Sequence, residues 1–113
     1  MLSNLDNDIK EKIGQMIERR MFEQALAIIN DYHEICPEDN DYYSIMACLK
    51  MVSGELTEAG NYISEGLRVA GRDHHDLLFN LYQLKSINGN VDEAVQVAIE
   101  MNLRHFNVLA ELN

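Results

Sequence analysis

The segment SGELTEAGNYI (residues 53–63) gives the clearest indication of the fold, because related segments occur on either side of it at almost the same spacing. These are RRMFEQALAII (19–29) and NGNVDEAVQVA (88–98). The alanines that align are Ala25, Ala59 and Ala94, which are 34 and 35 residues apart. Self-similarity at this period is typical of proteins built from repeated supersecondary units, so we expect each copy to fold in the same way.

Each aligned alanine opens an amphipathic helical pattern. In the second copy, apolar residues recur along one helix face at Leu56, Ala59, Ile63 and Leu67. A second helical pattern precedes each of these helices, at residues 8–20, 41–54 and 76–89. Gly54 and Gly89 end the later two patterns, as expected of glycines that cap a helix C-terminus, whereas Arg20 stands at that place in the first copy.

These units resemble the tetratricopeptide repeat, a helix–turn–helix unit of about 34 residues. The matching residues are Pro37, Ala47, Gly54, Ala59, Gly89 and Ala94, and the resemblance covers roughly residues 6–103. It implies an all-α fold, a right-handed superhelical array of antiparallel helix hairpins, which is a solenoid with about six or seven helices. It also implies a single domain over residues 1–113, with units at approximately 6–39, 40–73 and 75–103.

The C-terminal tail predicts one more helix, at residues 105–112, with Phe106, Leu109 and Leu112 along one side. A helical array leaves an open apolar face at each end, so we expect this helix to cap it. The alternatives are the first helix of a fourth unit, or an apolar edge through which the chain forms a homodimer.

In repeats of this kind the first helices usually line a concave face that binds the ligand. The resemblance therefore implies a non-catalytic module for protein–protein interaction. The positions that correspond to that face are Asp41, Ser44, Cys48, Met51, Asp76, Phe79, Gln83 and Ser86. An ordinary solvated helix face is the alternative interpretation of these residues. A second hypothesis is a structural role, either as a scaffold that self-associates through its terminal helices or as an accessory to a catalytic domain such as a bacterial glycosyltransferase.

The composition is that of an acidic globular domain. Nineteen acidic and nine basic residues give a formal net charge of −10, which repels nucleic acids and anionic membrane surfaces. We therefore expect a protein or peptide partner that is neutral or basic. No run approaches the roughly 20 apolar residues that cross a bilayer, and no signal-peptide pattern begins the chain, so we expect a cytoplasmic protein. In that compartment Cys36 and Cys48 are expected to be free thiols.

The stretch RDHHD (residues 72–76) raises the question of a metal site. A metal ion needs three or four converging ligands, but the side chains of the adjacent His74 and His75 diverge in most conformations. Neither a nucleophile elbow nor a phosphate-binding glycine loop occurs in the sequence. We therefore expect no catalytic residue, no metal and no cofactor. The stretch is interpreted as the connection between the second and third hairpins, with Asp76 capping the next helix as Asp41 does one period earlier.

Lys50 and Lys85 stand at the same position of the second and third copies, where the repeat consensus has an aromatic residue. One interpretation is that their aliphatic stems cover apolar surface while the ammonium groups reach water. The other is a basic ladder of two rungs that binds a carboxylate ligand.

Overall fold

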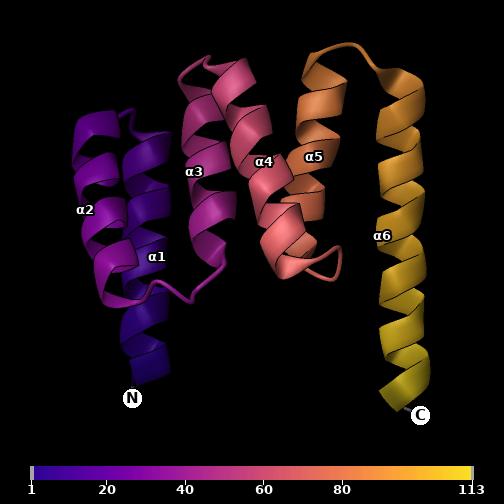
Figure 1. Ribbon diagram of the computed structural model, residues 1–113, viewed down its shortest axis with the longest axis horizontal. Helices are drawn as coiled ribbons and strands as arrows, with labels where there is room; N and C mark the ends of the chain where they lie inside the picture. The colour runs from indigo at the N-terminus through magenta and orange to yellow at the C-terminus, as the bar shows by residue number, and fades with distance from the viewer. Residues whose placement is uncertain (1, 113) are drawn as a thin grey trace.

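The computed structural model describes the backbone of residues 2–112 and the side chains of residues 7–105. Within these limits the chain forms six helices and no strand: α1 (Leu2–Glu18), α2 (Phe22–Ile35), α3 (Asp41–Val52), α4 (Leu56–Ala70), α5 (His75–Ile87) and α6 (Val91–Leu112) (Figure 1). The prediction of an all-α protein is therefore confirmed. Among the described helices, none is both long and apolar enough to cross a membrane.

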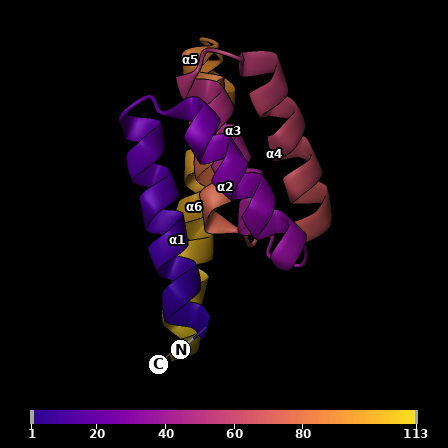
Figure 2. The ribbon, with the colours of Figure 1, turned by 90° about the vertical axis from the view of Figure 1, so that its left-hand side faces the viewer.

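Successive helices pair into hairpins. α1 packs with α2, α3 with α4, and α5 with α6, and the helices alternate in direction along the chain (Figure 1). α3 also contacts α1 and α5, while α2 and α4 each contact the first helix of the following pair. Figure 2 shows α1 and α4 on opposite sides of α3. The helices that begin the predicted units therefore lie beside one another in the order α1, α3, α5.

The turns within these hairpins share one backbone geometry. The residue at the turn has a left-handed conformation, with φ of 60° at Arg20, 84° at Gly54 and 79° at Gly89. In each turn the next amide donates to the carbonyl five residues before it: Met21 to Met16 at 2.8 Å, Glu55 to Lys50 at 2.8 Å, and Asn90 to Lys85 at 2.9 Å. This Schellman pattern satisfies carbonyl groups that the helix end leaves free. The same turn thus recurs at the sequence period, and Arg20 occupies a glycine position.

Replacing Arg20 by glycine should raise the free energy of unfolding by about 1 kcal/mol. A left-handed conformation costs an L-residue roughly 1–2 kcal/mol, and the extra entropy of glycine in the unfolded chain offsets part of that gain. Chemical denaturation measures the change. Arg19→Gly is the matched control, because Arg20 is the only non-glycine residue with positive φ in the described chain. Equal effects of the two substitutions would contradict the turn geometry.

The core lies between the helices in two clusters. The first joins α1, α2 and α3 through Ile13, Ile17, Ala25, Ile29, Met46 and Leu49. The second joins α3, α4 and α5 through Ala47, Ile63 and Leu84. Ala25 and Ala59 have no exposed surface, and Ala94 is 4% exposed. The aligned alanines therefore lie at helix contacts, where a small side chain allows the helices to approach closely.

The predicted N-caps at Asp41 and Asp76 are wrong. The cap positions are Asn40 and His74, so each helix begins earlier than expected. The Nδ1 atom of His74 accepts a hydrogen bond from the backbone N–H of Leu77 at 3.3 Å. Aspartate is among the residues most favoured at this position, but here His74 accepts this bond through one ring nitrogen while Asp41 lies 2.7 Å from the other.

The helix predicted at residues 105–112 is not a separate element. α6 continues through these residues without a break and is 22 residues long. The segment IEMNLRHF (99–106) contains no glycine or proline that would end a helix. In the described structure α6 contacts α5 and no other helix. The side chains of Phe106, Leu109 and Leu112 lie outside the described residues.

Candidate functional site

A hollow of about 290 Å³ lies between α1, α3 and α5. Its lining includes five of the residues selected from the sequence: Ser44, Cys48, Asp76, Phe79 and Gln83. Apolar side chains from α1 and α3 also line it, namely Ile13, Ile17 and Ile45. The first helices of the predicted units therefore share one concave surface.

α1 supplies part of this surface that the sequence prediction left out. Lys10, Gly14 and Ile17 line the hollow from α1. Lys10 and Gly14 precede Ser44 and Cys48 by 34 residues, so they occupy the equivalent places in the first copy. Applying the repeat period to the first copy would have found them.

The other three selected residues lie outside the hollow. Met51 packs against the second core cluster. The Ser86 hydroxyl donates to the backbone carbonyl of Tyr82 at 2.9 Å. Asp41 belongs to a polar network at one end of the hollow, described below. The hollow therefore extends only as far as Cys48 along α3 and Gln83 along α5.

Asn80 is a buried polar residue in the wall of the hollow. It is 5% exposed, and its Oδ1 atom has no hydrogen-bond partner within the part of the chain that the structure describes. A buried acceptor without a donor costs about 1–3 kcal/mol, and folded proteins rarely leave one unpaired. The Asn80 oxygen therefore costs stability at the wall of the hollow, and it is enclosed rather than open to a group that enters the hollow.

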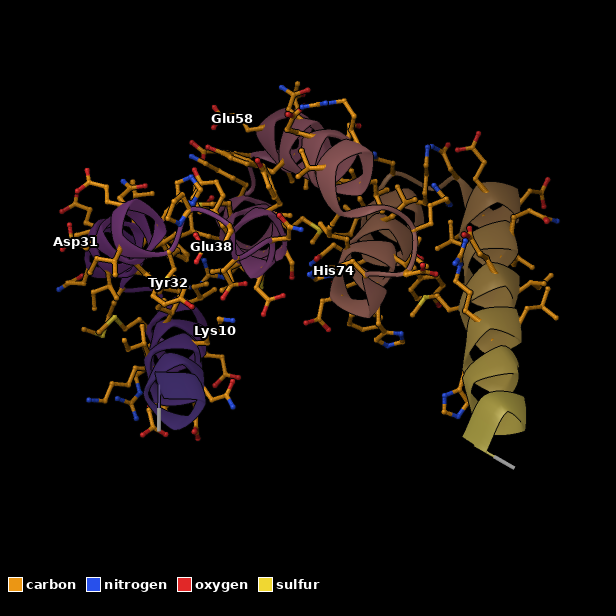
Figure 3. All side chains as sticks on the ribbon, turned by 60° about the horizontal axis from the view of Figure 1, so that its bottom comes forward. Lys10, Asp31, Tyr32, Glu38, Glu58 and His74 are labelled. Carbon is orange, nitrogen blue, oxygen red and sulfur yellow. The ribbon has the colours of Figure 1, made fainter. Side chains whose placement is uncertain are left out.

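A polar network lies at the end of the hollow where Lys10 enters it. Lys10 Nζ is 2.6 Å from Asp39 Oδ2 and 2.7 Å from Asp41 Oδ2. The Tyr32 hydroxyl donates to Asp39 at 2.6 Å, and Asp41 Oδ1 is 2.7 Å from His74 Nε2. Figure 3 shows Lys10 and Tyr32 close together, with His74 across from them beside α5. The network ties the three hairpins together, because its members come from α1, α2, α3 and the connections before α3 and α5.

The protonation of Lys10 and Asp39 is shifted by this pairing. Burial alone would lower the pKa of Lys10 and raise the pKa of Asp39. Hydrogen bonds and charge attraction within the network outweigh burial, so the pKa of Lys10 is raised and the pKa of Asp39 is lowered. A carboxyl group whose pKa is lower in the folded state stabilises the fold above its unfolded-state pKa. That stabilisation is lost as the pH falls through the folded-state pKa.

Asp39→Asn should therefore make the fold less sensitive to acid. The free energy of unfolding of the wild type should decrease as the pH falls below 3.8, the ordinary pKa of this carboxyl group. The decrease should be smaller in the variant, which has no proton to bind at that position. Urea denaturation at neutral and at acidic pH measures both. Asp31→Asn removes the same charge from an exposed position on α2, so this variant should keep the wild-type acid dependence. An unaltered acid dependence in Asp39→Asn would contradict the role of the network.

The two equivalent lysines are paired within their own hairpins. Lys50 Nζ lies 2.9 Å from Glu58 and 3.1 Å from Glu55, and Lys85 Nζ lies 2.7 Å from Glu93. Both ammonium groups thus reach across the turn to the acidic first turn of the next helix. They do not form a free basic ladder for a carboxylate ligand.

The Cys48 thiol is an apolar part of the hollow. Burial raises its pKa, and the nearby charge of Glu18 adds to the effect. The thiol is therefore protonated at neutral pH and is a weak nucleophile.

A larger hollow of about 560 Å³ lies beside α6. Its charged groups satisfy one another. Arg72 makes two hydrogen bonds to Glu100, at 2.6 and 2.7 Å, and Arg104 pairs with Glu100 and Asp73. These pairs fasten the connection after α4 to α6, and they leave the hollow less suited to recognising a charged ligand than the one between α1, α3 and α5.

The connection between α4 and α5 contains the first three residues of the RDHHD stretch, whereas His75 and Asp76 belong to α5. His74 joins the network through Asp41, whereas His75 is exposed in the first turn of α5. Among the described residues, no three histidine, cysteine, aspartate or glutamate side chains are grouped so that they could hold a metal ion.

In comparisons with known proteins, no family model, no curated protein and no solved structure matches the chain.

Proposed function

We propose that the chain is a non-catalytic interaction module that binds a segment of a partner protein on the surface formed by α1, α3 and α5. The fold that accompanies this proposal is a right-handed array of hairpins of the tetratricopeptide type. The spacing of 34 and 35 residues supports it, as do the turn geometry shared by residues 20, 54 and 89 and the contacts of each hairpin with the next.

The hollow between the three inner helices carries this proposal. Its volume of about 290 Å³ is at the lower limit of the range of roughly 300–1,000 Å³ typical of sites that enclose drug-sized ligands. It suits one or two side chains of a bound segment better than a cofactor. Its lining is mainly apolar with a few polar groups, among them the unpaired Asn80. Such a lining is typical of side-chain recognition.

The partner segment should be neutral or basic. The net charge of −10 attracts cations and repels polyanions. A cytoplasmic location is part of the proposal, and it is supported by Cys36 and Cys48, which are free thiols.

Selection of peptides from a random display library tests this function. Peptides that bind the immobilised chain should bind Phe79→Ala at least about tenfold more weakly, because Phe79 is 46% exposed and lines the hollow. Val95→Ala is the matched control, since Val95 is 48% exposed on α6, away from the hollow. Selected peptides that lose affinity for Val95→Ala but not for Phe79→Ala would contradict the proposal.

Self-association is a second candidate function, favoured by one feature of α6. Val91, Val95, Ile99 and Leu103 recur every four residues, and their exposed fractions lie between 46% and 65%. An apolar stripe on the surface often marks a protein interface. Light scattering would then give twice the chain mass of 13.0 kDa, and Ile99→Asp would restore the monomer. A monomer at all concentrations would exclude this candidate.

A further inference from the structure

One face of α5 carries a row of polar side chains that line the hollow. Asp76, Asn80 and Gln83 are spaced four and three residues apart, which places them on the same side of the helix. Asn80 Oδ1 is enclosed, whereas Asp76 is exposed and makes no ion pair with any described residue. The Asp76 carboxylate is therefore the acceptor on this face that a ligand in the hollow can reach.

The charges that line the hollow differ in their pairing. Lys10 lines the hollow, but its ammonium is held between Asp39 and Asp41 at 2.6 and 2.7 Å. Asp76 also lines the hollow and has no ion-pair partner among the described residues. A cation that enters the hollow can therefore pair with Asp76 without displacing Lys10 from its partners.

The apolar part of the lining suits a long side chain with a planar charged end. Phe79 is 46% exposed, and the half-buried Ile45 and Cys48 line the hollow from α3. An aliphatic stem can pack on these side chains, and a planar cation over the Phe79 ring gains a cation–π attraction. The volume of about 290 Å³ leaves room for this side chain and one apolar neighbour.

We propose that this hollow receives an arginine side chain of the partner segment, whose guanidinium donates to both oxygens of the Asp76 carboxylate while its stem packs against Phe79. This inference rests on the proposed function and names the residue that the surface recognises. Guanidinium has five donors in a fixed planar arrangement, so it can bind both carboxylate oxygens at once, which a lysine ammonium does less well.

Two blocked tripeptides test the inference: acetyl-Leu-Arg-Leu-amide and the same peptide with citrulline, which keeps the shape of arginine but has no charge. Each is titrated into nitrogen-labelled protein while the backbone amide signals are followed. The arginine peptide should produce saturable shifts at Ser44, Asn80 and Gln83. The citrulline peptide should bind at least about tenfold more weakly, because it loses the charge-assisted hydrogen bond.

Variants of the chain give the reciprocal test. Asp76→Asn should weaken binding of the arginine peptide by about tenfold and leave binding of the citrulline peptide unchanged. Asp31→Asn removes the same charge from α2, on the far side of that helix from Lys10 (Figure 3), and should change neither.

Three results would overturn the inference. They are equal binding of the two peptides, an unchanged affinity of Asp76→Asn for the arginine peptide, and no saturable shift around the hollow at millimolar peptide. The proposed function has its own test in the library-selected peptides. If those bind at the hollow without an arginine, the arginine inference fails and the proposed function stands. If they bind elsewhere, the proposed function fails.

Discussion

Replacing Leu77 by alanine should lower the free energy of unfolding by about 2–5 kcal/mol. Leu77 has no exposed surface, and its methyl groups approach α4 at Gly66. The substitution removes apolar contacts and leaves a cavity at the junction between the second and third hairpins. Urea denaturation measures the loss.

The effect of Leu77→Ala should also be uneven along the chain. Each described hairpin contacts the next one along the chain, so weakening one junction should loosen the elements beyond it. Amide hydrogen exchange should therefore accelerate more in α5 and α6 than in α1 and α2. Leu103→Ala is the matched control, because Leu103 is 60% exposed and its loss should change stability by about 0.5 kcal/mol or less. Equal acceleration in all helices would contradict the nearest-neighbour arrangement.

Gly66→Ala should destabilise the fold by about 1–3 kcal/mol, although alanine is the better helix former. A Cβ atom at position 66 would lie 2.7 Å from Cβ of Tyr43 and 2.8 and 2.9 Å from the two methyl carbons of Leu77. The Tyr43 Cβ is bonded directly to the backbone of α3, so a side-chain rotation cannot relieve the clash. α4 would have to move away from α3 and α5.

Two other helical glycines are controls for this substitution. A Cβ at Gly60 would meet one methyl group of Leu84 at 3.4 Å, and a Cβ at Gly14 would meet nothing within 4 Å. Gly14→Ala should therefore stabilise the fold by up to about 1 kcal/mol, and Gly60→Ala should change it little. Thermal melts of the three variants give the comparison. A gain in stability at all three positions would show that α4 does not pack closely at Gly66.

The helices could be predicted from the sequence because their signals are local and repeated. The period places Ala25, Ala59 and Ala94 at helix contacts, and Gly54 and Gly89 at turns. The turn at Arg20 has the same left-handed conformation and the same hydrogen bond as the turns at Gly54 and Gly89, although no glycine marks it in the sequence. The helix break predicted before residue 105 is absent, because the repeat period suggested a boundary where no glycine or proline ends α6.

The candidate site was predictable only where the period applied. Ser44, Cys48, Phe79 and Gln83 follow from their places in the second and third copies. The polar network around Lys10 could not be predicted from the period, because it depends on contacts of Lys10, Asp39 and His74 across three hairpins. The unpaired oxygen of Asn80 could not be inferred either, since hydrogen-bond satisfaction is a property of the packed helices and not of the order of residues.

The footprint of a library-selected peptide on the backbone amides tests whether α1, α3 and α5 form the binding surface. In proton–nitrogen correlation spectra, a saturating peptide should shift the amides of Gly14, Ser44, Cys48, Asn80 and Gln83, which line the hollow. The amides on the outer sides of α2 and α4 should keep their positions. Shifts confined to α6, or to α2 and α4, would contradict a binding surface formed by α1, α3 and α5.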